Sequence, residues 1–106
     1  MISEKRQFPV KIDVVAFEDQ EGLWVAQGIQ YDIVATARSV PDLRKAFVRQ
    51  VQANLALNAK LGREGLDGIP PAPEAYRRLW EQAEVKLEPL PPHPQNNIDM
   101  RLAEAA

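Results

Sequence analysis

The chain has 106 residues, of which 45% are hydrophobic, and its formal net charge is −2 at pH 7. This length suits one domain with a modest core, the charge gives nucleic acid no global attraction, and the absence of cysteine excludes disulfides, thiolate metal sites and cysteine nucleophiles. Because the sequence shows neither a long apolar run nor a charged-then-apolar leader, we expect a soluble, cytoplasmic protein.

A polar tail at residues 1–8 precedes the first predicted strand, residues 9–17. A polar segment that ends in glycine, residues 18–22, predicts a hairpin turn, so a second strand over residues 23–29 runs antiparallel to the first. A third strand follows over residues 33–38, after a turn without glycine.

A long helix is predicted from Ser39 to Leu61. Ser39 can act as the N-cap, Pro41 is tolerated in the first turn, and Gly62 can take the left-handed conformation that ends a helix. Apolar side chains recur every three or four residues and form one stripe facing the sheet. This stripe consists of Val40, Leu43, Phe47, Val51 and Leu55.

Glycine and proline dominate residues 62–73, which we interpret as a connector and not as a phosphate loop, because no strand precedes them and no Lys-Ser or Lys-Thr follows. A second, shorter helix is predicted over residues 73–83 and a fourth strand at a sheet edge over residues 85–90. Residues 91–106 are interpreted as a Pro-rich tail. Within it, apolar and polar residues alternate over residues 97–103, which can form a strand on an open sheet edge, swapped with a second chain.

The order and spacing of five segments give the chain a family resemblance. They are GLWVA at residues 22–26, ARSVPDL at 37–43, AF at 46–47, IPPAP at 69–73 and VKLEPL at 85–90. Together they resemble the HicB-like antitoxin domain over roughly residues 10–90. The chain departs from that family in residues 28–32, which replace a Cys-Pro and Pro-Gly turn, and in a longer connector.

The resemblance implies an α+β domain over residues 9–90: a three-stranded antiparallel sheet, a long helix, a short second helix and a fourth edge strand, like a partial ribonuclease H fold without its catalytic carboxylates. Such domains oligomerise and neutralise a small ribonuclease toxin by covering its surface. Full members append a DNA-binding module after the closing strand. Residues 97–102 match only the first strand of a ribbon, so we expect no operator binding of that kind.

Chemistry-bearing residues are few, and we expect neither enzymatic activity nor a cofactor. Ser39 is explained by its cap, and His93 lies among prolines with no acidic neighbour. Acidic residues at 18–21 suit a hairpin turn better than a calcium loop. Asp13 stands where ribonuclease-H-like enzymes carry an acid, but without further carboxylates it cannot hold two metal ions.

Surface contact is the remaining candidate function. We expect the long helix to cover the sheet face that carries Val10, Ile12, Val14, Leu23 and Val25. The opposite face would keep four large apolar side chains, a patch of the size that marks an interface. With the tail strand, the predicted interface residues are Val15, Phe17, Trp24, Val34, Ile98 and Met100. Alternatively, Tyr76 and Trp80 of the second helix cover this patch within one chain.

These observations favour a non-catalytic protein-interaction domain that forms a homo-oligomer and binds a protein partner by burying aromatic residues and adding a strand at an open edge. Three cations on the long helix, Arg44, Lys45 and Arg49, would adjust the electrostatic complementarity with the protein partner. The alternative is a nucleic-acid-binding module that uses this basic helix face.

Overall fold

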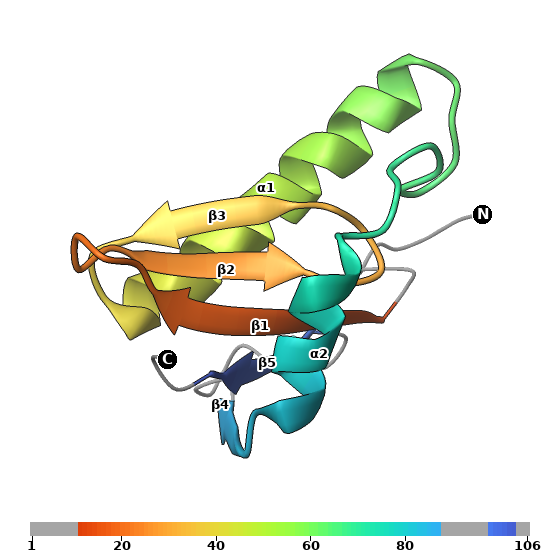
Figure 1. Ribbon diagram of the computed structural model, residues 1–106. Helices are drawn as coiled ribbons and strands as arrows, with labels where there is room; N and C mark the ends of the chain where they lie inside the picture. The colour runs from red at the N-terminus through yellow and green to blue at the C-terminus, as the bar shows by residue number, and fades with distance from the viewer. Residues whose placement is uncertain (1–10, 88–97, 104–106) are drawn as a thin grey trace.

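The computed structural model describes residues 11–87 and 98–103, which form an α+β fold with one sheet and two helices (Figure 1). In chain order the elements are β1 (Ile12–Glu18), β2 (Trp24–Gly28), β3 (Val34–Ala37), α1 (Val40–Lys60), α2 (Glu74–Gln82), β4 (Val85–Leu87) and β5 (Ile98–Leu102). The predictions for the tail at residues 1–8, for Val10 and for His93 lie outside the described residues. Within them, no helix is long and apolar enough to cross a membrane.

The sheet has five strands in the order β3-β2-β1-β5-β4, so the prediction of a three-stranded antiparallel sheet is wrong, although β1, β2 and β3 pair antiparallel and β4 lies at an edge as predicted. Its neighbours are antiparallel except β1 and β5, which are parallel. The predicted tail strand does form, but it lies between β1 and β4 of its own chain. It can do so because Ile98 and Met100 alternate with polar residues and add a buried row beside Ile12 and Val14.

One face of the sheet packs against α1 and forms the main core (Figure 1). Leu43, Phe47 and Val51 of α1 are buried, as the predicted stripe requires. Their partners from the sheet are alternate residues of the strands, because side chains on one face recur with a period of two. These partners are Ile12, Val14, Ala16, Ala26, Ala35, Ile98 and Met100, with Trp24 half-buried against them.

The face assignment of β2 was therefore wrong by one residue. Val14 pairs with Gly28 and Phe17 with Val25, so Val25 shares a face with Phe17, while Trp24 shares the α1 face with Val14. The register of a hairpin depends on its turn, and a shift by one residue moves every side chain to the other face. In this turn, Asp19 Oδ1 accepts from the backbone N–H groups of Glu21 and Leu23, which fixes the register.

Both ends of α1 follow the sequence prediction. Ser39 Oγ accepts from the Asp42 N–H at 3.3 Å, which caps the first turn. At the other end, Gly62 has a φ of 77°, and its N–H donates to the Ala59 carbonyl. The following connector returns across the sheet end, where the Asp32 N–H donates to the Pro70 carbonyl and the Ala72 N–H to that of Ile29.

The other face of the sheet carries α2, which lies across β1 on the opposite side from α1 (Figure 1). A second, smaller core forms there around Val15, Ile29 and Ala103, with Tyr76 and Trp80 of α2 packed against it. The molecule therefore has three layers, α1, the sheet and α2.

Candidate functional site

The predicted apolar patch on the second sheet face is covered within one chain. Val15 is fully buried, and the ring of Phe17 stacks on that of Tyr76 with centroids 6.1 Å apart. Trp80 packs on the same cluster, and the Arg101 guanidinium lies 3.8 Å from its ring centroid, a cation–π contact. The intramolecular alternative is therefore confirmed for Val15 and Phe17, and this face offers no open patch at these residues.

Three other predicted interface residues belong to the core as well. Trp24 packs on the α1 face, and Ile98 and Met100 are buried in β5 between β1 and β4. The structure therefore does not bring the six predicted interface residues together. It divides five of them between two cores on opposite faces of the sheet.

Val34 is the predicted interface residue that stays on the surface. This residue is 45% exposed, and it lies in β3, which forms one edge of the sheet. Thr36 on the same strand is exposed too. The candidate interface thus moves from a sheet face to a sheet edge.

The three predicted cations on α1 have different surroundings. Arg44 is half-buried, and its guanidinium donates to the carbonyl of Leu87, so it ties α1 to β4. Lys45 and Arg49 are exposed one turn apart on the helix. The structure therefore assigns Arg44 a structural contact and leaves two cations on the basic face.

A polar corner surrounds Asp13, the acid that the sequence singled out. Its carboxylate accepts from Gln30 Nε2 at 2.7 Å, and its backbone N–H donates to Gln30 Oε1 at 2.8 Å. Asp99 is its register partner on β5, and the Asp99 carboxylate lies 3.8 Å from the Arg101 guanidinium. Sequence reasoning missed this second acid because only the parallel pairing of β1 with β5 brings residues so far apart together.

This corner holds two neighbouring acids, and within the described residues no group of three or more His, Cys, Asp or Glu side chains gathers in a form that could hold a metal ion. Hard cations take six or more oxygen ligands. Gln30 and Arg101 already contact one acid each. The geometry therefore supports two polar contacts, one of Asp13 with Gln30 that joins β1 to the turn after β2, and one of Asp99 with Arg101 within β5.

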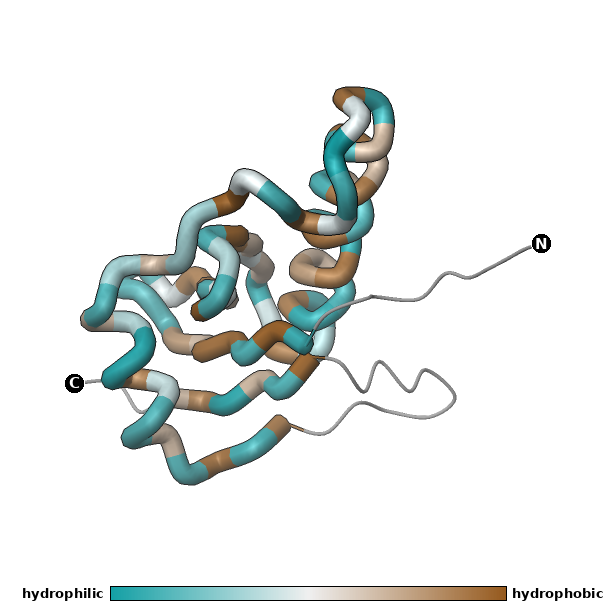
Figure 2. The backbone as a smooth tube through the Cα atoms, turned by 90° about the vertical axis from the view of Figure 1, so that its right-hand side faces the viewer, coloured by the Kyte–Doolittle hydropathy of each residue, from teal (hydrophilic) through white to brown (hydrophobic). Residues whose placement is uncertain are grey.

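The second half of α1 projects beyond the sheet, a feature that sequence reasoning missed (Figures 1 and 2). Leu57 and Leu61 lie one turn apart near its end and are 54% and 58% exposed. Between them, Asn58 is buried and donates through Nδ2 to the carbonyls of Gly65 and Asp67, and Leu66 of the connector is buried in the main core. The exposed leucines therefore stand on an end that the connector holds in place.

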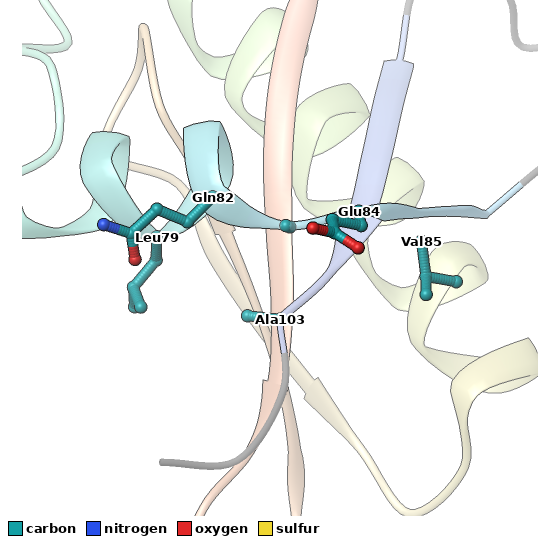
Figure 3. Close-up of a pocket in the computed structure, with 6 residues that line it drawn as sticks. Leu79, Gln82, Glu84, Val85 and Ala103 are labelled. Atoms are coloured by element: carbon teal, nitrogen blue, oxygen red, sulfur yellow. The ribbon is translucent and has the colours of Figure 1, made fainter.

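A pocket of about 310 Å³ opens between α2, β4 and the end of β5 (Figure 3). Leu79 and Gln82 line it from α2, with Ala83, Glu84 and Val85 after the helix end, and Ala103 lies where β5 ends. Leu79 and Val85 are 36% and 46% exposed. The lining carries one acid and one amide, which is too few convergent polar groups to indicate a particular small ligand.

Comparisons with protein-family models, with curated proteins and with solved structures found no match to this chain.

Proposed function

We propose that this chain is a non-catalytic protein-interaction domain that forms a homo-oligomer and binds a second protein. The observation that carries the proposal is the projecting end of α1, where Leu57 and Leu61 are more than half exposed on a well-anchored helix end. Two adjacent large apolar side chains in water favour contact with another surface, since burying each contributes about 1.5 to 3 kcal/mol at most.

The anchoring of this end supports the proposal further. Asn58 and Leu66 hold the connector against α1, so the leucines are presented in a fixed geometry and little order has to be created on binding. The resemblance to HicB-like antitoxins suggests the kind of partner, a small ribonuclease toxin whose surface the domain would cover.

A second candidate function is nucleic-acid binding through the basic helix face. It is favoured by Lys45 and Arg49, which are exposed one turn apart on α1. Two cations can contact neighbouring phosphates, although Arg44 is occupied by the Leu87 carbonyl. Binding of this kind weakens steeply with salt, whereas an apolar protein contact does not.

The test begins with affinity capture of the tagged chain from its native extract, followed by calorimetry with the captured protein. Leu57→Ser combined with Leu61→Ser should raise the dissociation constant by about tenfold or more, because it removes two apolar contacts. Ala59→Ser, an exposed change on the opposite side of the same helix, is the matched control and should change it little.

Equal binding by the leucine variant and the control would contradict the protein-binding proposal. Binding of a short DNA duplex and of a single-stranded RNA, measured at low and high salt, distinguishes nucleic-acid binding from protein binding. Salt-sensitive binding that is lost on combining Lys45→Gln with Arg49→Gln would favour nucleic acid instead.

A further inference from the structure

Within the described residues, the outer edge of β3 presents backbone groups without a hydrogen-bond partner. The Gly28 N–H donates to the Ile33 carbonyl at 2.8 Å, so Ile33 bonds inward to β2. Residues alternate along an antiparallel strand, so Ala35 and Ala37 also bond inward, whereas the N–H and C=O groups of Val34 and Thr36 point away from the sheet. The edge therefore offers a short ladder to another strand.

This edge has only some of the devices that usually protect sheet edges: β3 is four residues long, and the connector covers one end of the edge, where the Asp32 N–H donates to the Pro70 carbonyl. β3 contains no lysine, no proline and no charged residue, and its two outward residues are β-branched and exposed, with Val34 at 45%. Edge strands that must stay single are commonly shortened, charged or interrupted by a bulge or a proline. The chemistry of β3 thus suits strand addition.

We propose that β3 pairs antiparallel with β3 of a second copy of this chain, about a twofold axis at Ala35, so that the two sheets become continuous. In this register Val34 lies opposite the partner's Thr36, and Asp32 lies opposite the partner's Arg38. A twofold interface uses the same patch on both chains, so each of these pairs occurs twice.

Charge selects this register over the neighbouring ones. Asp32 and Arg38 are both exposed and have opposite signs at the two ends of the strand. Asp32 accepts from Gln27 Nε2 through Oδ1, and a carboxylate can accept from several donors, so it can also meet a guanidinium. Pairing Val34 with the partner's Val34, or Thr36 with the partner's Thr36, also forms the backbone hydrogen bonds. In those registers, however, Asp32 does not lie opposite the partner's Arg38.

The proposal rests on the proposed homo-oligomerisation and names its interface. The homo-oligomerisation and the β3 interface can be disproved separately. A chain that stays monomeric at high micromolar concentration would overturn both, whereas an oligomer that forms without contact between the two β3 strands would overturn only this inference.

Cysteine cross-linking tests the register directly, because the natural chain contains no cysteine. Val34→Cys and Thr36→Cys chains are mixed in equal amounts and oxidised. Opposite residues of a hydrogen-bonded antiparallel pair have Cα atoms about 5.5 Å apart, within the range that a disulfide spans. We expect cross-links between the two variants, while cross-links confined to identical variants would show a shifted register and overturn the proposal.

Charge exchange tests the ion pairs in the cysteine-free chain by sedimentation. Arg38→Glu places two acids opposite each other and should weaken the dimer by about tenfold, since two exposed pairs are lost and replaced by repulsion. Adding Asp32→Lys to that variant should restore association. Circular dichroism confirms the fold of both variants, and equal association of Arg38→Glu and the natural chain would overturn the proposal.

Discussion

Asn58 shows how one polar side chain determines where the exposed leucines stand. Gln27 and Asn58 are the uncharged polar residues buried in the described part of the chain, and both use their amides to satisfy backbone carbonyls. Asn58 donates to two carbonyls of the connector, those of Gly65 and Asp67, and so joins the last turn of α1 to the loop that follows. This contact turns a helix end that would fray into a fixed surface.

Asn58→Ala should lower the free energy of unfolding by about 1 to 3 kcal/mol, because it leaves two carbonyls near the core without their donor. Urea denaturation measures the change. The matched control is Asn54→Ala on the same helix, which removes one exposed bond to the Gln50 carbonyl and should cost less than about 0.5 kcal/mol. Equal losses in the two variants would show that the connector is not held by Asn58.

At the scale of elements, α2 decides which face of the sheet is available. It has no buried residue of its own, yet Tyr76 and Trp80 cover Val15 and Phe17. Trp80 also donates from Nε1 to the Asp99 carbonyl at 3.4 Å and packs against the Arg101 guanidinium. This helix therefore depends on a few contacts of its aromatic side chains with β1 and β5.

Trp80→Ala should destabilise the protein by about 2 to 4 kcal/mol, since it removes a large half-buried ring and its cation–π contact. The amides of α2 should exchange faster than those of α1, which keeps its own core. Chemical denaturation and hydrogen exchange measure the two effects, with exposed Arg78→Ala of the same helix as the control. Uniform exchange across both helices would contradict a locally attached α2.

At the scale of the whole molecule, β5 completes the sheet. It bonds to β1 on one side and to β4 on the other, and it brings Ile98 and Met100 into the main core. Without it, β1 would become an edge and β4 would lose its only neighbour in the sheet. The end of the described chain is thus part of the fold.

A chain that ends at residue 97 should fail to fold cooperatively. Losing the burial of Ile98 and Met100 costs about 3 to 6 kcal/mol, which is comparable with the total stability of a small domain. A chain that ends at residue 103 keeps every described contact and is the control. Thermal unfolding followed by circular dichroism compares the two, and a cooperative transition in the shorter chain would show that β5 is dispensable.

The elements whose signals are local could be predicted from the sequence. The Ser39 cap, Gly62 and the apolar stripe between them predict α1 nearly to the residue, and the hairpin before β2 follows from its turn. These features depend on interactions between residues that are close in the sequence, so the local sequence is enough to predict them. For the candidate site, the sequence identified Val34, Lys45 and Arg49, and the structure places all three at the surface.

Only the tertiary structure decided where β5 and β4 join the sheet, which register β2 takes and which face is covered. Nothing local to Asp13 points to Asp99, and nothing in β2 alone says that Trp24 faces α1, because strand order and register depend on contacts between distant residues and on one turn. The same holds for the exposure of Leu57 and Leu61, since an apolar helix position is buried only where another element lies over it. The sequence by itself therefore determined the elements, and long-range packing determined the surfaces they leave open.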